Sequence, residues 1–219
     1  MSVSDRLRAD AGPIWEKIIE HPFVVELYRG DLPLYKFRFY ILQDYNYLIA
    51  AMKNFGIIAS RAPSVEALRE IVEILDLEAR SEFDGYTALL KELGYSLTDA
   101  AGIEPVEIGV SYSGFLLSTS SLGTYAESLA AVLPCFWSYA EIADRHREML
   151  GGNANRLYRE WGSAYLSDPY LRLVDKLKKL LDEAGEKAPY ERLNEAFITA
   201  SRYEYMFWDA VYQRREWPV

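Results

Sequence analysis

The chain has 219 residues, enough for one large or two small domains, and half of its residues are hydrophobic. Its 33 acidic residues exceed its 24 Lys and Arg, so the net charge of −9 makes it a poor candidate for binding nucleic acid. The longest apolar run, residues 129–137, is far shorter than the roughly 20 residues of a membrane-spanning helix. We therefore expect the protein to bind neither nucleic acid nor a membrane.

The N-terminus and the cysteine content indicate the compartment. Residues 1–10 carry charges of both signs and no apolar stretch, which does not fit a signal peptide. The single cysteine, Cys135, excludes an internal disulfide and a cysteine-rich metal site. We therefore expect a cytoplasmic protein. The five Asn and two Gln are few for this length, which is typical of a thermophile.

Apolar residues recur at nearly 3.6-residue spacing along most of the chain, and this spacing predicts helices. The expected helices cover residues 3–21, 33–59, 64–93, 105–123, 125–149, 155–166, 169–184 and 189–214. We expect residues 23–28 to form a short apolar turn. We also expect the helix over 105–123 to loosen at Gly114 and again near residues 118–123. Gly94 stands where a glycine commonly follows a helix end. No stretch alternates with period two, so we expect one all-α domain over residues 1–219, with seven to nine helices.

Cys135 lies in the middle of the helix expected over residues 125–149. A free cysteine is commonly a small buried hydrophobe, so packing alone is one interpretation. Pro134, directly before it, removes a backbone hydrogen bond and predicts a kink that costs stability. Tyr139, one helical turn later, shares the face of Cys135, where its hydroxyl can approach the sulfur. A nucleophilic role therefore competes with packing.

Two carboxylates also fall on apolar helix faces. Asp44 shares its stripe with Tyr40, Tyr47 and Leu48, so its side chain is expected to point inward. Glu204 precedes Trp208 by four residues and is expected to share a face with it. A buried carboxylate must be paired or hydrogen-bonded, so each residue is a candidate either for a structural ion pair or for catalysis.

Taken together, these segments resemble the TenA/thiaminase II family. The matching segments are His21-Pro22-Phe23-Val24, the pattern from Phe37 to Leu48, Ser111-Tyr112-Ser113, Tyr125-x-Glu127-x-Leu129-Ala130-Ala131 leading into Pro134-Cys135-x-Trp137-x-Tyr139, Trp161-x-x-x-Tyr165, and Glu204-x-x-Phe207-Trp208. They span residues 21–208. The resemblance implies a heme-oxygenase-like all-α bundle, and Cys135 places the chain in the branch with an active-site cysteine. One departure is Tyr86, where many members carry a histidine four residues after the glutamate that matches Glu82.

The resemblance implies a hydrolase of thiamin salvage. Such enzymes release 4-amino-5-hydroxymethyl-2-methylpyrimidine from 4-amino-5-aminomethyl-2-methylpyrimidine and, more slowly, from thiamin. It implies no cofactor and no metal, an aminopyrimidine as the small-molecule partner, and a homotetramer. We expect exposed aromatic side chains on the long helices, which would suit large subunit interfaces.

The expected chemistry is covalent catalysis, because direct displacement at a methylene on an electron-rich aminopyrimidine is slow. A Cys135 thiolate would add to the adjacent ring carbon and let the ring expel the amine or thiazole. By resemblance, Tyr47 and Tyr165 favour the thiolate. Glu204 is expected to donate a proton to the ring nitrogen, and Asp44 to accept a hydrogen bond from the exocyclic amine. The remaining substrate-binding residues, expected to flank the ring or hydrogen-bond to it, are Tyr112 and Tyr139.

Three other functions are weighed against this one. A heme-degrading enzyme needs an axial histidine, and the chain offers only His21 and His146, of which His21 precedes a helix-breaking proline. A di-iron carboxylate protein needs Glu-x-x-His on each of two helices, a pattern that this chain lacks. A non-catalytic pyrimidine-binding or regulatory protein would bind the pyrimidine without turnover.

Overall fold

The computed structural model describes residues 1–219 as helices joined by short loops, with no strand. The α-helices are α1 (Val3–Asp10), α2 (Gly12–Ile19), α3 (Pro22–Arg29), α4 (Leu34–Ser60), α5 (Val65–Leu77), α6 (Phe83–Glu92), α7 (Leu97–Gly102), α8 (Glu107–Leu122), α9 (Tyr125–Arg145), α10 (Arg147–Gly152), α11 (Arg156–Ala164), α12 (Asp168–Gly185) and α13 (Tyr190–Gln213). A π-helical turn, η1 (Glu78–Glu82), joins α5 to α6. The all-α prediction is confirmed.

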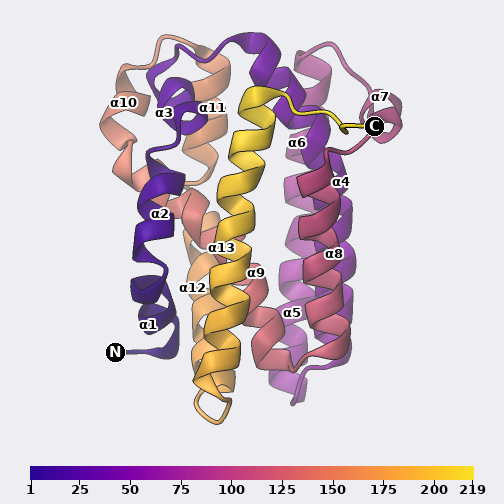
Figure 1. Ribbon diagram of the computed structural model, residues 1–219, viewed down its shortest axis with the longest axis vertical. Helices are drawn as coiled ribbons and strands as arrows, with labels where there is room; N and C mark the ends of the chain where they lie inside the picture. The colour runs from indigo at the N-terminus through magenta and orange to yellow at the C-terminus, as the bar shows by residue number, and fades with distance from the viewer.

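The long helices run roughly along the longest axis of the molecule, and α9 and α13 lie side by side at its centre (Figure 1). Helices α4, α5, α6 and α8 flank this central pair on one side, whereas α1 and α2 lie on the other. Helix α9 also packs against α12. Residues 126–134 of α9 are all buried, because this helix is covered on every side. A helix that is apolar all round belongs in a core.

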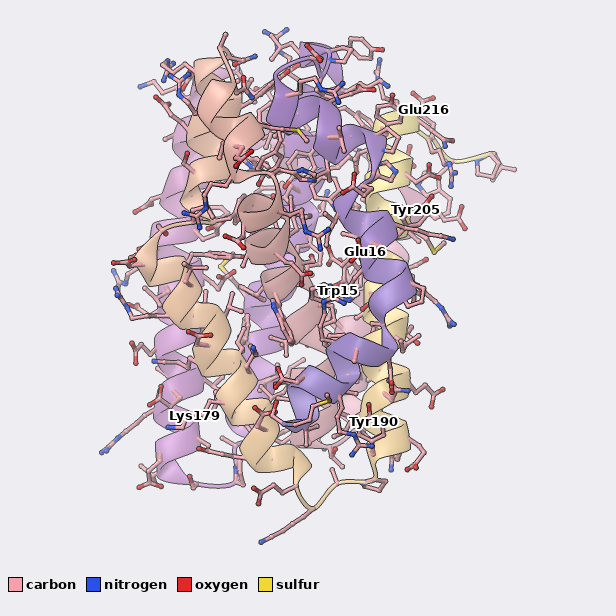
Figure 2. The ribbon with its side chains drawn as sticks, turned by 90° about the vertical axis from the view of Figure 1, so that its left-hand side faces the viewer. Trp15, Glu16, Lys179, Tyr190, Tyr205 and Glu216 are labelled. Carbon is pink, nitrogen blue, oxygen red and sulfur yellow. The ribbon has the colours of Figure 1, made fainter.

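The N-terminal helices cover the central pair through large aromatic side chains. Trp15 of α2 lies fully buried, and it is labelled at the middle of this face in Figure 2. Its indole N–H donates a hydrogen bond to the Ser201 hydroxyl at 2.9 Å, and its ring stacks on Phe197 of α13. Its edge meets Trp137 of α9, with ring centroids 5.5 Å apart. These contacts attach α2 to both central helices.

Several expected helices are divided where proline or a cap interrupts the backbone. The first ends at Asp10, and α2 restarts at Gly12 with Pro13 in its first turn, where a missing N–H costs nothing. The prediction of a turn over residues 23–28 is wrong. Pro22 occupies the first position of α3, and His21 caps that helix by accepting the Phe23 N–H. Proline therefore starts a helix here as well as ending one.

The other differences raise the helix count above the seven to nine predicted. The helix over residues 125–149 ends at Arg145, and α10 begins beyond His146. Helix α7 was not expected, and it is set by a capping box between Ser96 and Asp99. The expected loosening at Gly114 and near residues 118–123 is wrong, because α8 continues to Leu122 while packed against α4.

Both histidines are used within the fold. His21 is buried at the start of α3, which its side chain caps. Burial lowers the pKa of His21 to about 4, which keeps it neutral at physiological pH. The Nε2–H of His146 donates to the Ile19 carbonyl at 2.9 Å. Each imidazole therefore has a structural partner.

None of the helices combines the length and the apolar character needed to cross a membrane.

Candidate functional site

Six of the seven residues singled out from the sequence lie on four helices that meet in the bundle. Helix α4 carries Asp44 and Tyr47, α8 carries Tyr112, α9 carries Cys135 and Tyr139, and α13 carries Glu204. The seventh, Tyr165, follows the last residue of α11. Residues separated by up to 160 positions in the sequence are thus brought into one region.

Glu204 is the most deeply buried carboxylate of this group, with 3% of its surface exposed. Its Oε1 accepts a hydrogen bond from the Tyr112 hydroxyl at 2.6 Å. No arginine pairs with it, so the alternative of a structural ion pair is wrong. Burial raises the pKa of Glu204 to about 7, although the hydrogen bond from Tyr112 and the nearby Cys135 thiol favour the ionised form. A carboxyl with this pKa exchanges its proton near neutral pH.

The Cys135 thiol lies beside the Glu204 carboxyl and the Tyr47 hydroxyl. Burial, reinforced by the negative charge of Glu204, raises the pKa of Cys135 well above its usual value, whereas the Tyr47 hydroxyl acts in the opposite direction. The raised pKa therefore favours the thiol form of the sulfur. The Tyr47 hydroxyl is buried and makes no formed hydrogen bond, which leaves it free to bind a ligand atom or the sulfur.

Asp44 points inward, as its position on the α4 stripe predicts. The expectation that it must be paired or hydrogen-bonded is wrong, because no side chain or backbone group bonds to it. Burial and the nearby Glu82 and Glu204 raise the pKa of Asp44 well above its usual value. The raised pKa favours the neutral carboxyl, which costs less to bury than a carboxylate.

The aromatic residues form a packed wall around these groups. Tyr112 lies between the ring of Tyr47, 5.2 Å away, and the ring of Tyr203, which stacks on it at 5.2 Å. This packing aims the Tyr112 hydroxyl at Glu204 and places Tyr47 next to it. The two tyrosines are thus positioned by ring contacts and leave their polar ends in the site.

Tyr139 does not approach the sulfur as its spacing predicts. Its hydroxyl instead pairs with the Tyr40 hydroxyl at 3.3 Å, and its ring packs against Tyr165, with centroids 4.9 Å apart. Tyr165 in turn meets the ring of Tyr170 at 5.1 Å. Tyr47, and not Tyr139 or Tyr165, is therefore the tyrosine whose hydroxyl interacts with the Cys135 thiol.

A cavity of about 430 Å³ opens between α4, η1, α6, α11 and α12. Of the seven residues, Asp44 and Tyr165 line it; the other five lie in the packed interior. Glu204 lies close enough to Asp44 to raise the pKa of its carboxyl, so the Asp44 end of the cavity adjoins the Cys135–Glu204 pair. The volume is that of a small-molecule site. The remaining walls are largely apolar.

Two cavity carboxylates, Glu78 and Glu82, were not singled out as site residues from the sequence. Both belong to the π-helical turn. The signal was available, because Ile71, Ile74, Glu78 and Glu82 continue one helical stripe of spacing three to four. Nowhere in the chain do three or more His, Cys, Asp or Glu side chains form a group that could hold a metal ion.

Comparison with known proteins places this geometry in a family. A model of the TENA/THI-4/PQQC family matches residues 8–214. An aminopyrimidine aminohydrolase of Halalkalibacterium halodurans is 34% identical, and the alignment covers 99% of this chain and 98% of that protein. This similarity confirms the expectation of an enzyme, a hydrolase.

Solved structures agree with the same assignment. The TenA homologue from P. horikoshii OT3 has a TM-score of 0.94 at 45% identity, covering 97% of this chain and 99% of its own. A domain with a heme oxygenase-like fold from Shewanella denitrificans superimposes with a TM-score of 0.77 at 14% identity, over 96% of this chain and 92% of its own. The heme-oxygenase-like fold is therefore confirmed. The matches span nearly the whole chain, and the chain belongs to the TENA/THI-4/PQQC family.

Proposed function

We propose that this protein hydrolyses the C–N bond that joins the methylene of 4-amino-5-aminomethyl-2-methylpyrimidine to its amine, and the corresponding bond of thiamin. The product would be 4-amino-5-hydroxymethyl-2-methylpyrimidine. The observation that carries the proposal is that Cys135 and Glu204, from two helices, lie near Asp44 of a third helix, which lines a small-molecule cavity. The name of the aminohydrolase from Halalkalibacterium halodurans also supports it.

The first step forms a carbon–sulfur bond. As the Cys135 sulfur attacks the ring carbon adjacent to the one bearing the methylene, its proton passes to the Glu204 carboxylate. The ring nitrogen next to the attacked carbon gains an electron pair and takes that proton from Glu204. A pKa of about 7 suits Glu204 to both transfers, because it binds the proton neither too tightly nor too weakly.

The second step breaks the carbon–nitrogen bond. The exocyclic amine of the ring supplies an electron pair, and the leaving group departs with the bonding pair, which leaves an exocyclic methylene and a positively charged amidine. A carboxyl oxygen of Asp44 would accept a hydrogen bond from this amidine, stabilising the charge as it develops.

Water then completes the reaction. Its oxygen adds to the methylene, and its surplus proton goes to the released amine. The Cys135 sulfur leaves with its bonding pair, and the ring nitrogen returns its proton to Glu204. Glu204 then passes this proton to the sulfur, which restores the thiol and the carboxylate. The Tyr47 hydroxyl, which lies beside the sulfur, would stabilise the departing thiolate. The residues proposed to flank the ring or to shape its site are Tyr112, Tyr139 and Tyr165.

The proposal is tested by incubating the protein separately with the aminomethylpyrimidine and with thiamin, and by following the hydroxymethylpyrimidine chromatographically. Release of this product by the wild type, and not by a Cys135→Ser variant, would support it. A protein that binds the product pyrimidine but never turns over either substrate would instead be the binding or regulatory protein considered above.

We further propose that residues 1–219 act as one domain and assemble as a cytoplasmic homotetramer. The exposed aromatic side chains expected for the interfaces are few. Tyr35 on α4 and Trp217 are exposed, whereas the apolar stripe on α5 consists of Val65, Leu68 and Val72. Light scattering on the purified protein would measure the subunit number. A thermophilic source stays a prediction.

A further inference from the structure

Two carboxylates of the cavity have no role in the chemistry above. Glu78 and Glu82 lie on η1, the five-residue π-helical turn between α5 and α6. Both line the cavity that also contains Asp44. The charge of Glu82 helps to raise the pKa of Asp44, and the charge of Asp44 helps to raise the pKa of Glu78. A π-helical turn inside a longer helix is rare and occurs frequently at functional sites.

Neither carboxylate has a counter-charge. Glu78 is only 7% exposed, yet no Lys, Arg or His pairs with it and no group donates a hydrogen bond to it. The other two cavity glutamates differ, because Glu92 and Glu160 are exposed and both pair with Arg156. Glu78 and Glu82 therefore have no cationic partner, whereas Glu92 and Glu160 share one.

The surroundings indicate the kind of partner that would fit. The carboxylates are not grouped closely enough with other ligands to hold a metal ion. The same cavity is lined by the rings of Trp161, Tyr165 and Tyr170, and aromatic faces attract organic cations. A cavity of about 430 Å³ with an apolar wall and an unpaired pair of carboxylates suits a small organic cation.

We infer that Glu78 and Glu82 form a subsite for the positively charged leaving group of the substrate. This inference rests on the proposed function, in which the pyrimidine ring lies at the Asp44 end of the cavity. Both leaving groups are cationic before reaction: a primary amine is an ammonium at neutral pH, and the thiazole of thiamin is a thiazolium. When either cation enters the cavity, it would supply the positive charge that Glu78 and Glu82 lack as ionised carboxylates.

The subsite would act on binding more than on the chemical step. When the C–N bond breaks, its electron pair goes to the nitrogen, so the ammonium leaves as neutral ammonia and the thiazolium as neutral thiazole. The attraction to Glu78 and Glu82 is therefore present in the substrate complex and is lost after cleavage. Removing it should raise KM with little change in kcat.

The test compares one cationic and one neutral ligand that share the same ring. In a Cys135→Ser background, which stops turnover, calorimetry would measure the Kd of the aminomethylpyrimidine and of the hydroxymethylpyrimidine. Glu78→Gln and Glu82→Gln should each weaken the cationic ligand at least about tenfold, because a buried charge pair loses one partner. The neutral ligand should change by less than about threefold, because the amide keeps the size of the side chain.

Glu160→Gln is the matched control, because Glu160 lines the same cavity but is exposed and already paired with Arg156. It should leave the affinity of both ligands unchanged. In the enzyme with Cys135 intact, Glu82→Gln should raise KM for the aminomethylpyrimidine and preserve kcat. Melting curves of all variants would show that they are folded.

Equal weakening of the two ligands, or no weakening of the cationic one, would overturn the subsite. If the variants give either of these results but the wild-type protein turns over its substrate and binds the neutral product, the proposed function stands and only the subsite fails. If the wild type neither turns over nor binds either pyrimidine, the proposed function fails and the subsite fails with it.

Discussion

Replacement of Glu204 by glutamine separates a catalytic from a structural role for this residue. The amide keeps the shape of the side chain, and its oxygen can still accept the hydrogen bond from Tyr112. It cannot carry the proton that the ring nitrogen requires. General acid–base catalysis is typically worth about 10²–10⁴-fold, so we expect kcat to fall by that order. Affinity for the hydroxymethylpyrimidine should fall less.

Although kcat should fall, the same variant should be more stable than the wild type at alkaline pH. The pKa of Glu204 is raised from 4.5 to about 7 on folding, so the folded protein holds its proton more tightly than the unfolded chain. This contribution to stability is complete below about pH 4.5 and is lost as the pH rises to about 7. The pKa difference corresponds to about 3 kcal/mol of unfolding free energy. Glu204→Gln carries no titrating group and should escape this loss.

The assay is therefore a pair of measurements at two pH values. At pH 8, Glu204→Gln should melt at a higher temperature than the wild type, whereas near pH 4.5 the two should be similar. Single-turnover kinetics would report the chemical step. Glu127→Gln is the control, since Glu127 is also buried but pairs with Arg192 and caps α9. It should lose stability and keep its rate once folded.

A stable Glu204→Gln variant that retains its rate would refute the assignment of the proton transfer. A variant that is less stable than the wild type at pH 8 would refute the electrostatic reasoning, because it would reveal a favourable partner of the ionised carboxylate. Breaking a buried ion pair typically costs about 3–5 kcal/mol, so the two signs are easily distinguished.

Three further variants test the remaining groups. Cys135→Ser should abolish turnover with the fold intact, and activity above roughly a tenth of wild type, a barrier change below about 1.4 kcal/mol, would exclude the nucleophile. Asp44→Asn should raise KM and lower kcat without lowering the melting temperature, because no partner is lost; a fall in stability with KM unchanged would indicate a structural residue. Tyr112→Phe removes a hydrogen bond that lowers the pKa of Glu204, and the first step requires Glu204 as a carboxylate, so the acid limb of the pH–rate profile should move to higher pH. An unshifted limb would show that Glu204 does not set it.

Local chemistry explains which parts of the fold the sequence predicts. The helix predicted over residues 33–59 is found as α4 over Leu34–Ser60, because its apolar stripe and the preceding proline act within a few residues of each other. Gly94 follows α6 with a φ of 86°, a conformation that glycine adopts without strain. The breaks at His146 and at the π-helical turn do not follow from the sequence, because the helical spacing of apolar residues predicts one helix across each position.

In the candidate site, too, the sequence predicts some features and leaves others undetermined. Periodicity alone places Asp44 and Glu204 on inward faces, since each shares a stripe with large apolar residues. It does not reveal their partners. Tyr112 bonds to Glu204 across 92 positions, and Tyr139 pairs with Tyr40 across 99, because the crossing of α8 with α13 and of α4 with α9 decides which hydroxyls meet.

By itself, the sequence determined the helical class, the inward faces and the kinds of side chain available for chemistry, because these depend on residues three or four positions apart. The tertiary structure alone decided which of those side chains share a cavity and which carboxylates remain unpaired. Glu78 and Glu127 are both buried glutamates, yet Glu127 meets Arg192 and Glu78 meets no cation. Their protonation therefore depends on neighbours that only the folded chain brings near, since the energy of a buried charge is set by what surrounds it in space.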